Sequence, residues 1–331
     1  MKLLIKNIKK LINVRDESPC RPLSGGELGV LPTIDNGYLL IEEGLISDYG
    51  RMEKCDLQSL ENAVDKVIDA AGKMVFPSYC DSHTHLVYAG SREIEFMDKI
   101  RGLSYQEIAR RGGGILNSVE LLHNTSEDAL YAQAKGRAEE IIAFGTGAVE
   151  IKSGYGLTLE DEIKMLRVAK RVEEETPLTV KRTFLGAHAV PARYAGRRVE
   201  YVDEIVREMI PAVAAEGLAD YVDIFCEEGF FSVEDSEKIF EVGIKYGMRP
   251  KVHANQMSFS GGVQVGVKYG ARSVDHLEFT GEAEFEALKG SDTIPTLLPG
   301  ATFFLEMDFA PARRMIECGL PVAIASNYNP G

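Results

Sequence analysis

Two histidines one residue apart, His83 and His85, end an apolar segment in the first third of the chain. Side chains two residues apart on an extended strand point to the same side, so both imidazoles would face one point in space. That arrangement suits a divalent metal ion, but a lone His-x-His pair is about as often two polar residues on an exposed strand. The pair alone leaves both interpretations open, and residues far downstream bear on the choice.

Five of the six histidines stand where short apolar segments end. A single buried histidine is usually satisfied by a backbone carbonyl and has a structural role. Five that converge on one face instead favour a zinc or iron site, because imidazole nitrogens bind both metals and catalytic sites keep a position open for water. The five are His83, His85, His188, His253 and His276. His123 falls elsewhere, in a helix or loop.

Eight segments from residue 74 onward have the pattern of a strand, and turns and helical stretches separate them. Residues 158–161 open one such helix and residues 241–247 close another. Eight strand-then-helix units predict an α/β protein with a (β/α)8 TIM barrel, whose active site lies at the carboxyl ends of the strands. A doubly wound open sheet is the alternative, but it does not explain the histidines at strand ends. The strands are expected to end within residues 83–85, 149–155, 184–188, 222–228, 251–256, 273–276, 294–299 and 322–327.

Residues 1–73 do not fit the barrel pattern. Short apolar runs alternate there with Gly, Asp and Asn, which predicts the N-terminal part of a small, sandwich-like β domain. The first ten residues are expected to form an edge strand and no signal peptide, because lysines interrupt their apolar stretch. The barrel is expected to occupy residues 74–331. Because the chain stops directly after the eighth strand, we expect the last helix and the C-terminal strands of the small domain to be missing.

Composition narrows the class of protein. The 331 residues include 37 Lys and Arg against 51 Asp and Glu, a formal net charge of −14, which argues against binding to nucleic acid or anionic membranes. No apolar run approaches the roughly 20 residues of a membrane-spanning helix. Five scattered cysteines without a Cys-x-x-Cys pair indicate reduced thiols in the cytoplasm. A small anionic substrate would therefore need a local cation in its site.

Several motifs together resemble a known family. The pair at residues 83–85, His253, His276 and the polar end of the eighth strand resemble the metal-dependent barrel hydrolases of the amidohydrolase superfamily. Within that superfamily the chain is similar to the imidazolonepropionases of histidine degradation, in order and over nearly its whole length. The segments that carry this resemblance are residues 80–93, 112–116, 150–157, 183–188, 253–256, 275–278, 297–301 and 329–331.

The resemblance implies a reaction and a cofactor. The reaction is the hydrolysis of the cyclic amide 4-imidazolone-5-propanoate to N-formimidoyl-L-glutamate, and the cofactor is one divalent metal ion, Zn²⁺ or Fe²⁺/Fe³⁺. A single metal is expected because the fourth strand ends in residues 226–228, Cys-Glu-Glu, without the bridging lysine of binuclear relatives. The implied metal ligands are His83, His85, His253 and Asn327. The family resemblance also suggests a homodimer.

The resemblance further implies substrate contacts. Arg92, in the loop after the first barrel strand, is expected to bind the substrate carboxylate with both prongs of its guanidinium, although an arbitrary arginine is more often solvated. His276 is expected to polarise the attacked carbonyl or stabilise its oxyanion, and Gln256 to hydrogen-bond the substrate and take part in catalysis. The other implied substrate contacts are Tyr155, His188, Asn329 and Gly331.

Asn327 departs from the family pattern, in which the eighth strand carries an aspartate that binds the metal and shuttles the proton of water. An amide offers a weak neutral ligand and no base, and loss of a catalytic base lowers the rate by about 10²–10⁴. The substitution is inactivating, or the base role has moved to His276 or a neighbour, or the chain end is altered. Two alternatives therefore stand beside the hydrolase: a silent relative that binds a metal or ligand, and a hydrolase or deaminase of another cyclic substrate.

Overall fold

The computed structural model describes residues 1–15, 21–103 and 114–331, which divide into two compact units, residues 1–78 and 79–331. Gly112 and Gly113, which belong to one of the family motifs, lie outside the described residues. No helix within the described ranges is long and apolar enough to cross a membrane. The cysteines in those ranges, Cys55, Cys80, Cys226 and Cys318, form no disulfide.

The smaller unit is a mixed sheet in the order β3-β2-β1-β4, with β5 also paired to β1. One face of the sheet buries Leu4, Tyr38 and Leu40, against which the short helix α1 (Leu57–Ala63) packs Leu57 and Leu60. The strands are β1 (Lys2–Ile12), β2 (Thr33–Glu42), β3 (Leu45–Arg51), β4 (Lys66–Asp69) and β5 (Met74–Val75).

The expectation that the first strand lies at an edge is wrong. Strand β1 pairs with β2 on one side and with β4 and β5 on the other, so it is central. Lys6 and Lys10 of this strand pair with Glu61 and Asp35, so lysines in an apolar segment do not by themselves indicate an edge. The apolar residues Leu4 and Ile8 meanwhile reach the interior and are fully buried.

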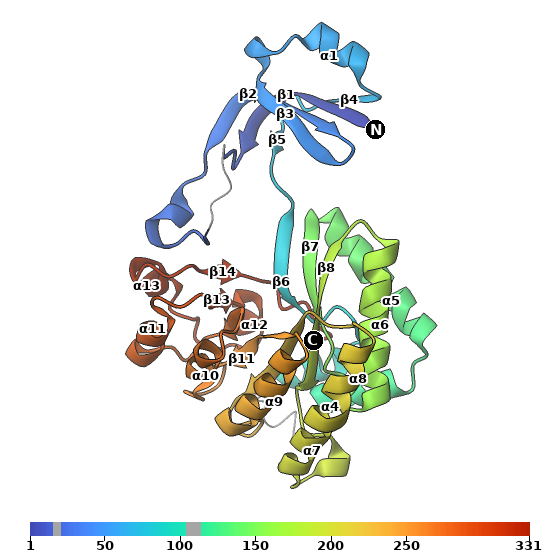
Figure 1. Cartoon of the computed structure of the whole chain (residues 1–331), viewed down its shortest axis with the longest axis vertical. Helices are drawn as coiled ribbons and strands as arrows, with labels where there is room; N and C mark the ends of the chain where they lie inside the picture. Colours follow the sequence, from blue (N-terminus) through green and yellow to red (C-terminus); the bar gives the residue numbers. More distant parts are fainter. Residues whose placement is uncertain (16–20, 104–113) are drawn as a thin grey trace. The chain divides into compact units, whose positions relative to one another are not determined.

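The larger unit is the predicted (β/α)8 barrel, which the structure confirms (Figure 1). Its parallel strands follow one another in the order β14-β13-β12-β11-β9-β8-β7-β6, and the short β10 (Arg249–Pro250) pairs with β9. The strands are β6 (Tyr79–Thr84), β7 (Thr146–Lys152), β8 (Thr179–Ala187), β9 (Tyr221–Cys226), β11 (Val252–Ala254), β12 (Ser273–His276), β13 (Ile294–Leu297) and β14 (Ala323–Ile324).

The barrel closes between the residues that follow β14 and the first barrel strand. The amide of Asn327 donates to the carbonyl of His83 at 3.1 Å, and the amide of His85 donates to the carbonyl of Tyr328 at 2.7 Å. This closure sets the polar residues of the chain's last segment directly beside the His-x-His pair.

Helices cover the outside of the barrel, and their starts follow the sequence signals. As predicted, helix α6 (Leu159–Glu175) begins after Thr158, and helix α9 (Val233–Lys245) ends just before Gly247. The hydroxyl of Thr158 accepts the amide of Asp161. Both helices turn an apolar stripe toward the strands, as expected for a barrel layer. The other helices are α2 (Glu93–Ile100), α4 (Ile115–His123), α5 (Glu127–Ala143), α7 (Arg198–Glu204), α8 (Ile210–Ala215), α10 (Gly262–Lys268), α11 (Glu282–Leu288), α12 (Pro299–Phe304) and α13 (Ala312–Glu317).

Candidate active site

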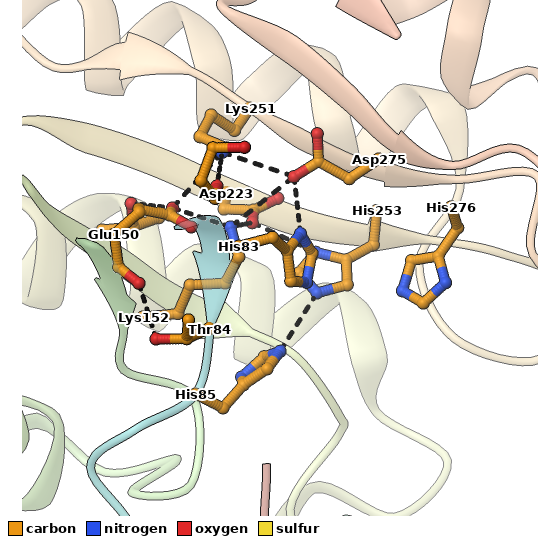
Figure 2. Close-up of polar contacts among 12 residues, drawn as sticks. His83, Thr84, His85, Glu150, Lys152, Asp223, Lys251, His253, Asp275 and His276 are labelled. Atoms are coloured by element: carbon orange, nitrogen blue, oxygen red, sulfur yellow. Dashed lines mark hydrogen bonds and ion pairs between the residues drawn. The ribbon is translucent and has the colours of Figure 1, made fainter. Parts of the chain in front are cut away.

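The carboxyl ends of β6, β11 and β12 bring four buried histidines together (Figure 2). The ring centroids of His83 and His253 lie 4.5 Å apart, and those of His83 and His276 lie 5.6 Å apart. One nitrogen from each of His83, His85 and His253 falls within 4.8 Å of the other two. The structure therefore assembles the three imidazoles that the sequence pattern proposed as metal ligands.

A carboxylate faces Nδ1 of two of these rings. Nδ1 of His83 donates to Oδ2 of Asp275 at 2.6 Å, and Nδ1 of His253 lies 3.1 Å from Oδ2 of Asp223. With the proton on Nδ1, each ring keeps a lone pair on Nε2. Burial lowers the pKa of the His83, His85 and His253 imidazoles below the usual value, so the rings are neutral as ligands must be.

Whether the site fits a metal ion depends on the hydrogen-bond partners of the imidazole Nε2 atoms. Nε2 of His253 and Nε2 of His85 are only 3.4 Å apart, and Nε2 of His83 is buried with no hydrogen-bond partner among the described residues. With their protons on Nδ1, His83 and His253 each bury an Nε2 lone pair here, and that of His83 meets no donor, which is unfavourable unless a cation lies among the rings. The three histidines therefore fit a divalent metal ion.

A layer of buried charges lies beneath the histidines; we call it the ionic layer. It comprises Glu150, Lys152, Asp223, Lys251 and Asp275, all of them buried (Figure 2). Nζ of Lys152 lies 2.7 Å from Asp223 and 2.8 Å from Glu150, and Nζ of Lys251 lies 3.3 Å from Asp275. Each carboxylate that orients a histidine is therefore itself paired with a lysine.

Electrostatics keep Asp223 and Lys152 charged, whereas burial raises the pKa of Glu150. Burial by itself also raises the pKa of Asp223, but the ammonium group of Lys152 and the polar contact with His253 outweigh it and hold that pKa well below its usual value. Burial likewise opposes the charge on Lys152, and the surrounding carboxylates overcome it and raise the pKa of the ammonium group. Mutual pairing, and not solvent, maintains these charges.

Asn327 occupies the opposite side of the site, after β14. Its backbone has φ of +55°, a left-handed conformation that Asn and Asp adopt more readily than most residues. Its side-chain oxygen Oδ1 is buried and has no hydrogen-bond partner within the described residues. The amide oxygen is thus a neutral acceptor without a partner, at the position where the family pattern has an aspartate.

A cleft opens to solvent over the candidate metal-ligand histidines. All of the predicted site residues line it except His83, which is fully buried. The predicted residues that line it are His85, Arg92, Tyr155, His188, His253, Gln256, His276, Asn327, Asn329 and Gly331.

Arg92 lines this cleft and is buried, with 7% of the residue exposed, so it is not a solvated surface residue. Its Nε donates to the hydroxyl of Ser118 on α4 at 2.9 Å, which holds the guanidinium in place. Its Nη1 lies 3.5 Å from the carbonyl oxygen of Gly331, and its Nη2 is buried without a partner among the described residues. A buried, unpaired guanidinium nitrogen calls for an anion.

His188 and Tyr155 form an aromatic wall of the cleft. The ring of His188 stacks on His85, with centroids 5.0 Å apart and an interplanar angle of 11°, and the Tyr155 ring lies 5.3 Å from it. Nδ1 of His188 donates to the carbonyl of Gly154 at 3.0 Å, which leaves Nε2 as an acceptor. Burial lowers the pKa of His188 to about 3, so the ring is neutral.

His276 has an unusual backbone for a residue other than glycine, with φ of +89°, and Leu277 follows with φ of +71°. Such conformations are unfavourable by about 1–3 kcal/mol each and persist only where the surroundings impose them. Nδ1 of His276 lies 3.7 Å from the carboxylate of Glu278, which accepts the hydroxyl of Thr302 at 2.7 Å. This strained turn aims the imidazole of His276 into the cleft.

Two loops place the remaining predicted residues. Asn329 donates to the carbonyl of Asn327 at 2.7 Å and accepts the amide of Gly331 at 2.8 Å, so its side chain shapes the loop after β14. Gln256 stands in a loop that Glu227, at the end of β9, anchors by accepting the amide of Met257 at 2.9 Å. The side chain of Asn329 is thus engaged within its own loop.

Sequence reasoning missed the ionic layer, Ser118 and Glu227. Charged residues within otherwise apolar strand segments, such as Glu150-Ile151-Lys152, were the available signal for the ionic layer. Because both faces of a strand in such a barrel are covered, a charge there must find a buried partner. Nothing comparable marks Ser118, which lies on a helix with ordinary amphipathic spacing.

No family model matches the chain. Curated relatives do: imidazolonepropionase of Flavobacterium johnsoniae is 53% identical over 328 residues, covering 99% of this chain and 79% of the relative. Imidazolonepropionase of Flavobacterium psychrophilum is 54% identical over 331 residues, covering 100% of this chain and 79% of the relative. That of Christiangramia forsetii is 50% identical over 331 residues, with the same coverage.

Solved structures of similar fold share little sequence with the chain. A triazine hydrolase from Arthrobacter aurescens has a TM-score of 0.66 at 13% identity, covering 98% of this chain and 71% of that one. Guanine deaminase from C. acetobutylicum with bound guanine has a TM-score of 0.64 at 13% identity, covering 99% and 74%. Atrazine chlorohydrolase TrzN from A. aurescens, complexed with zinc, has a TM-score of 0.62 at 12% identity, covering 98% and 72%. At these identities the likeness shows the fold alone.

Proposed function

The chain belongs to the imidazolonepropionase family of hydrolases that act on cyclic amides, and we propose that it hydrolyses 4-imidazolone-5-propanoate to N-formimidoyl-L-glutamate. One observation carries the proposal: the candidate metal ligands and the buried, partly unpaired guanidinium of Arg92 line or underlie the same cleft. Such a cleft suits a small ring with an anionic tail.

The proposed metal ligands are His83, His85 and His253, with the neutral carbonyl of Asn327 as a weak fourth ligand. A divalent ion held there supplies Lewis acidity, which polarises an amide carbonyl and lowers the pKa of water. Imidazole nitrogens with an oxygen ligand accept zinc and iron alike, so we propose either ion. The ionic layer keeps the two carboxylate-backed rings in the correct tautomer for this task.

The other residues of the cleft have separable roles in the proposal. Arg92 binds the carboxylate of the substrate through the guanidinium edge that the protein leaves unpaired. Nε2 of His188 accepts a ring N–H, and Tyr155 and Gln256 bound the ring. Nε2 of His276 hydrogen-bonds the carbonyl oxygen, so that it stabilises negative charge developing there. Asn329 and Gly331 shape the end of the cleft next to Arg92.

Hydrolysis is tested by incubating the metal-loaded chain with 4-imidazolone-5-propanoate and detecting N-formimidoyl-L-glutamate by mass spectrometry. We expect product from the chain, more from its Asn327→Asp version, and almost none from an Arg92→Met variant at low substrate concentration. Absence of product from both the chain and the Asn327→Asp version contradicts the proposal.

The neutral side chain of Asn327 favours one second candidate, a relative that binds the ligand without turning it over. The two functions differ in one measurement, the rate of product formation against the uncatalysed rate. Ligand binding with no rate above that background, restored to turnover by Asn327→Asp, indicates the silent relative. A substantial rate in both proteins excludes it.

A further inference from the structure

The loop that follows β7, residues 153–157, contains unfavourable backbone conformations that its surroundings must stabilise. Gly154 has φ of +109° and Leu157 has φ of +54°, the second in a left-handed conformation unfavourable for a leucine. A Cβ added at Gly154 would lie 2.9 Å from Nδ1 of His188, so this close approach requires glycine. The loop carries Tyr155 into the cleft and touches His188, so its shape matters for the ring of a ligand.

Glu162 holds this loop from the first turns of α6. Its side chain is fully buried. Oε2 accepts the amide of Gly154 at 3.0 Å, and Oε1 accepts the amides of Gly156 and Leu157 at 2.8 Å each. Three backbone amides that converge on one carboxylate fix the loop in a way that a neutral side chain cannot reproduce, because an amide has a single acceptor oxygen.

Gly154 links Glu162 to the cleft. Its N–H donates to Glu162, and its carbonyl accepts Nδ1–H of His188 at 3.0 Å. The position of that carbonyl decides which nitrogen of His188 carries the proton and how the ring is turned. Since the His188 ring is parallel to that of His85, a shift of the loop would also disturb the stacked wall of the cleft.

We propose that Glu162 is a positioning residue for ring recognition: through the residues 154–157 it fixes the tautomer of His188 and the place of Tyr155. The inference rests on the proposed function, in which the amide ring lies against these two side chains. Glu162 touches neither the ligand nor the candidate metal ligands, so its effect is on binding of the ring and not on metal content.

The test compares Glu162→Gln with Glu160→Gln, a matched control that removes one charge from the exposed side of the same helical turn. Two quantities are measured on the full metal-loaded chain. Calorimetry gives the Kd for hydantoin-5-propanoate, a five-membered cyclic amide with ring N–H groups and the same tail. Nitrogen-15 NMR of histidine-labelled protein gives the tautomer of His188.

Loss of one of the loop hydrogen bonds is expected to weaken binding of this probe by about fivefold, which corresponds to the loss of one ordinary hydrogen bond. In Glu162→Gln the Nδ1–H signal of His188 is expected to give way to a mixture of tautomers, with metal content unchanged. Glu160→Gln is expected to match the parent in both measurements. A folded Glu162→Gln variant with the parent's Kd and tautomer overturns the proposal.

A second variant covers the case in which Glu162→Gln does not fold. Glu162→Asp keeps the charge but is one methylene shorter, so it cannot reach all three amides, and the same two changes are expected in a weaker form. Parent-like values in it overturn the proposal equally. Failure of the parent itself to bind the probe counts against the proposed function, whereas the His188 tautomer still reports on Glu162.

Discussion

The two sides of the metal-ligand cluster differ in how much protein stands behind each ligand. On the side of β6 and β11, His83 and His253 each face a buried carboxylate, and each carboxylate is paired with a lysine. On the side of β14, the side chain of Asn327 has a buried oxygen with no partner among the described residues. The first side is built to hold a cation, and the second contributes neither charge nor a base.

This difference separates two properties that usually occur together in a hydrolase site. Affinity for the metal depends on neutral, oriented imidazoles, and the ionic layer supplies their orientation. Removal of a proton from water depends on a group with a suitable pKa, and an amide has none. Under the proposed function, the substitution at position 327 therefore lowers turnover more than it lowers binding of the metal or the substrate.

The largest expected effect comes from adding a carboxylate on the β14 side of the histidine cluster, as already present on the other side. Asn327→Asp places a carboxylate at a φ of +55° that aspartate tolerates, and it restores a base beside the cluster. We expect kcat for 4-imidazolone-5-propanoate to rise by about 10²–10⁴. Asn327→Gly, which also tolerates this backbone but has no side chain, is the control and is expected to show no gain. An unchanged kcat in Asn327→Asp means that another group already acts as the base.

Next in size is the effect of removing a cation from the ionic layer. Lys152→Met leaves Asp223 buried without its lysine and Glu150 with the more distant Lys251 alone, which is expected to lower the free energy of unfolding by about 3–5 kcal/mol. Urea unfolding of the metal-free chain measures it. Lys181→Met, which breaks the more exposed pair with Asp220, is the control, and its expected cost is at most about 1 kcal/mol. Equal losses in the two variants contradict the account of the ionic layer.

A third variant weakens the support behind a single ligand. Asp275→Asn keeps the size of the side chain but removes the charge that faces Nδ1 of His83. Loss of such a partner typically weakens metal binding by about 10–100-fold, and competition with a chelator measures this change. Glu278→Gln, which alters the neighbour of His276 instead, is expected to leave metal affinity unchanged and to lower kcat. If both variants release the metal equally, His276 belongs to the metal site.

The sequence predicted the barrel and the histidine cluster well because both follow from local pattern. Parallel strands end at one edge, so polar residues at strand ends such as His83 and His253 must meet, whatever the register of the sheet. The partners of Lys152 could not be predicted in this way. Glu150 is two residues away on the same strand, but Asp223 comes from β9 and meets Lys152 only once three strands are in register inside a closed barrel.

Helix residues that act on the cleft were equally hidden. Ser118 and Glu162 lie at buried helix positions that periodicity assigns only to packing. Their roles depend on which loop each helix covers, a property of the tertiary structure. The small unit gave an error of position. The pattern of the first ten residues predicts a strand, but pairing on both sides of β1 involves segments that are distant in sequence.

The smallest expected effect concerns the arginine side of the cleft and bears on specificity. Ser118→Ala removes the hydroxyl that holds Nε of Arg92, and the loss of one such hydrogen bond, about 1 kcal/mol, is expected to raise the KM for 4-imidazolone-5-propanoate about fivefold with kcat nearly unchanged. The effect should disappear with the neutral propanamide analogue, because only a carboxylate depends on the aim of the guanidinium. Ser118→Thr keeps the hydroxyl and is expected to restore the parent KM. An equal rise in KM for both ligands would instead indicate a general distortion of the cleft, since a guanidinium held by Ser118 acts on the charged tail alone.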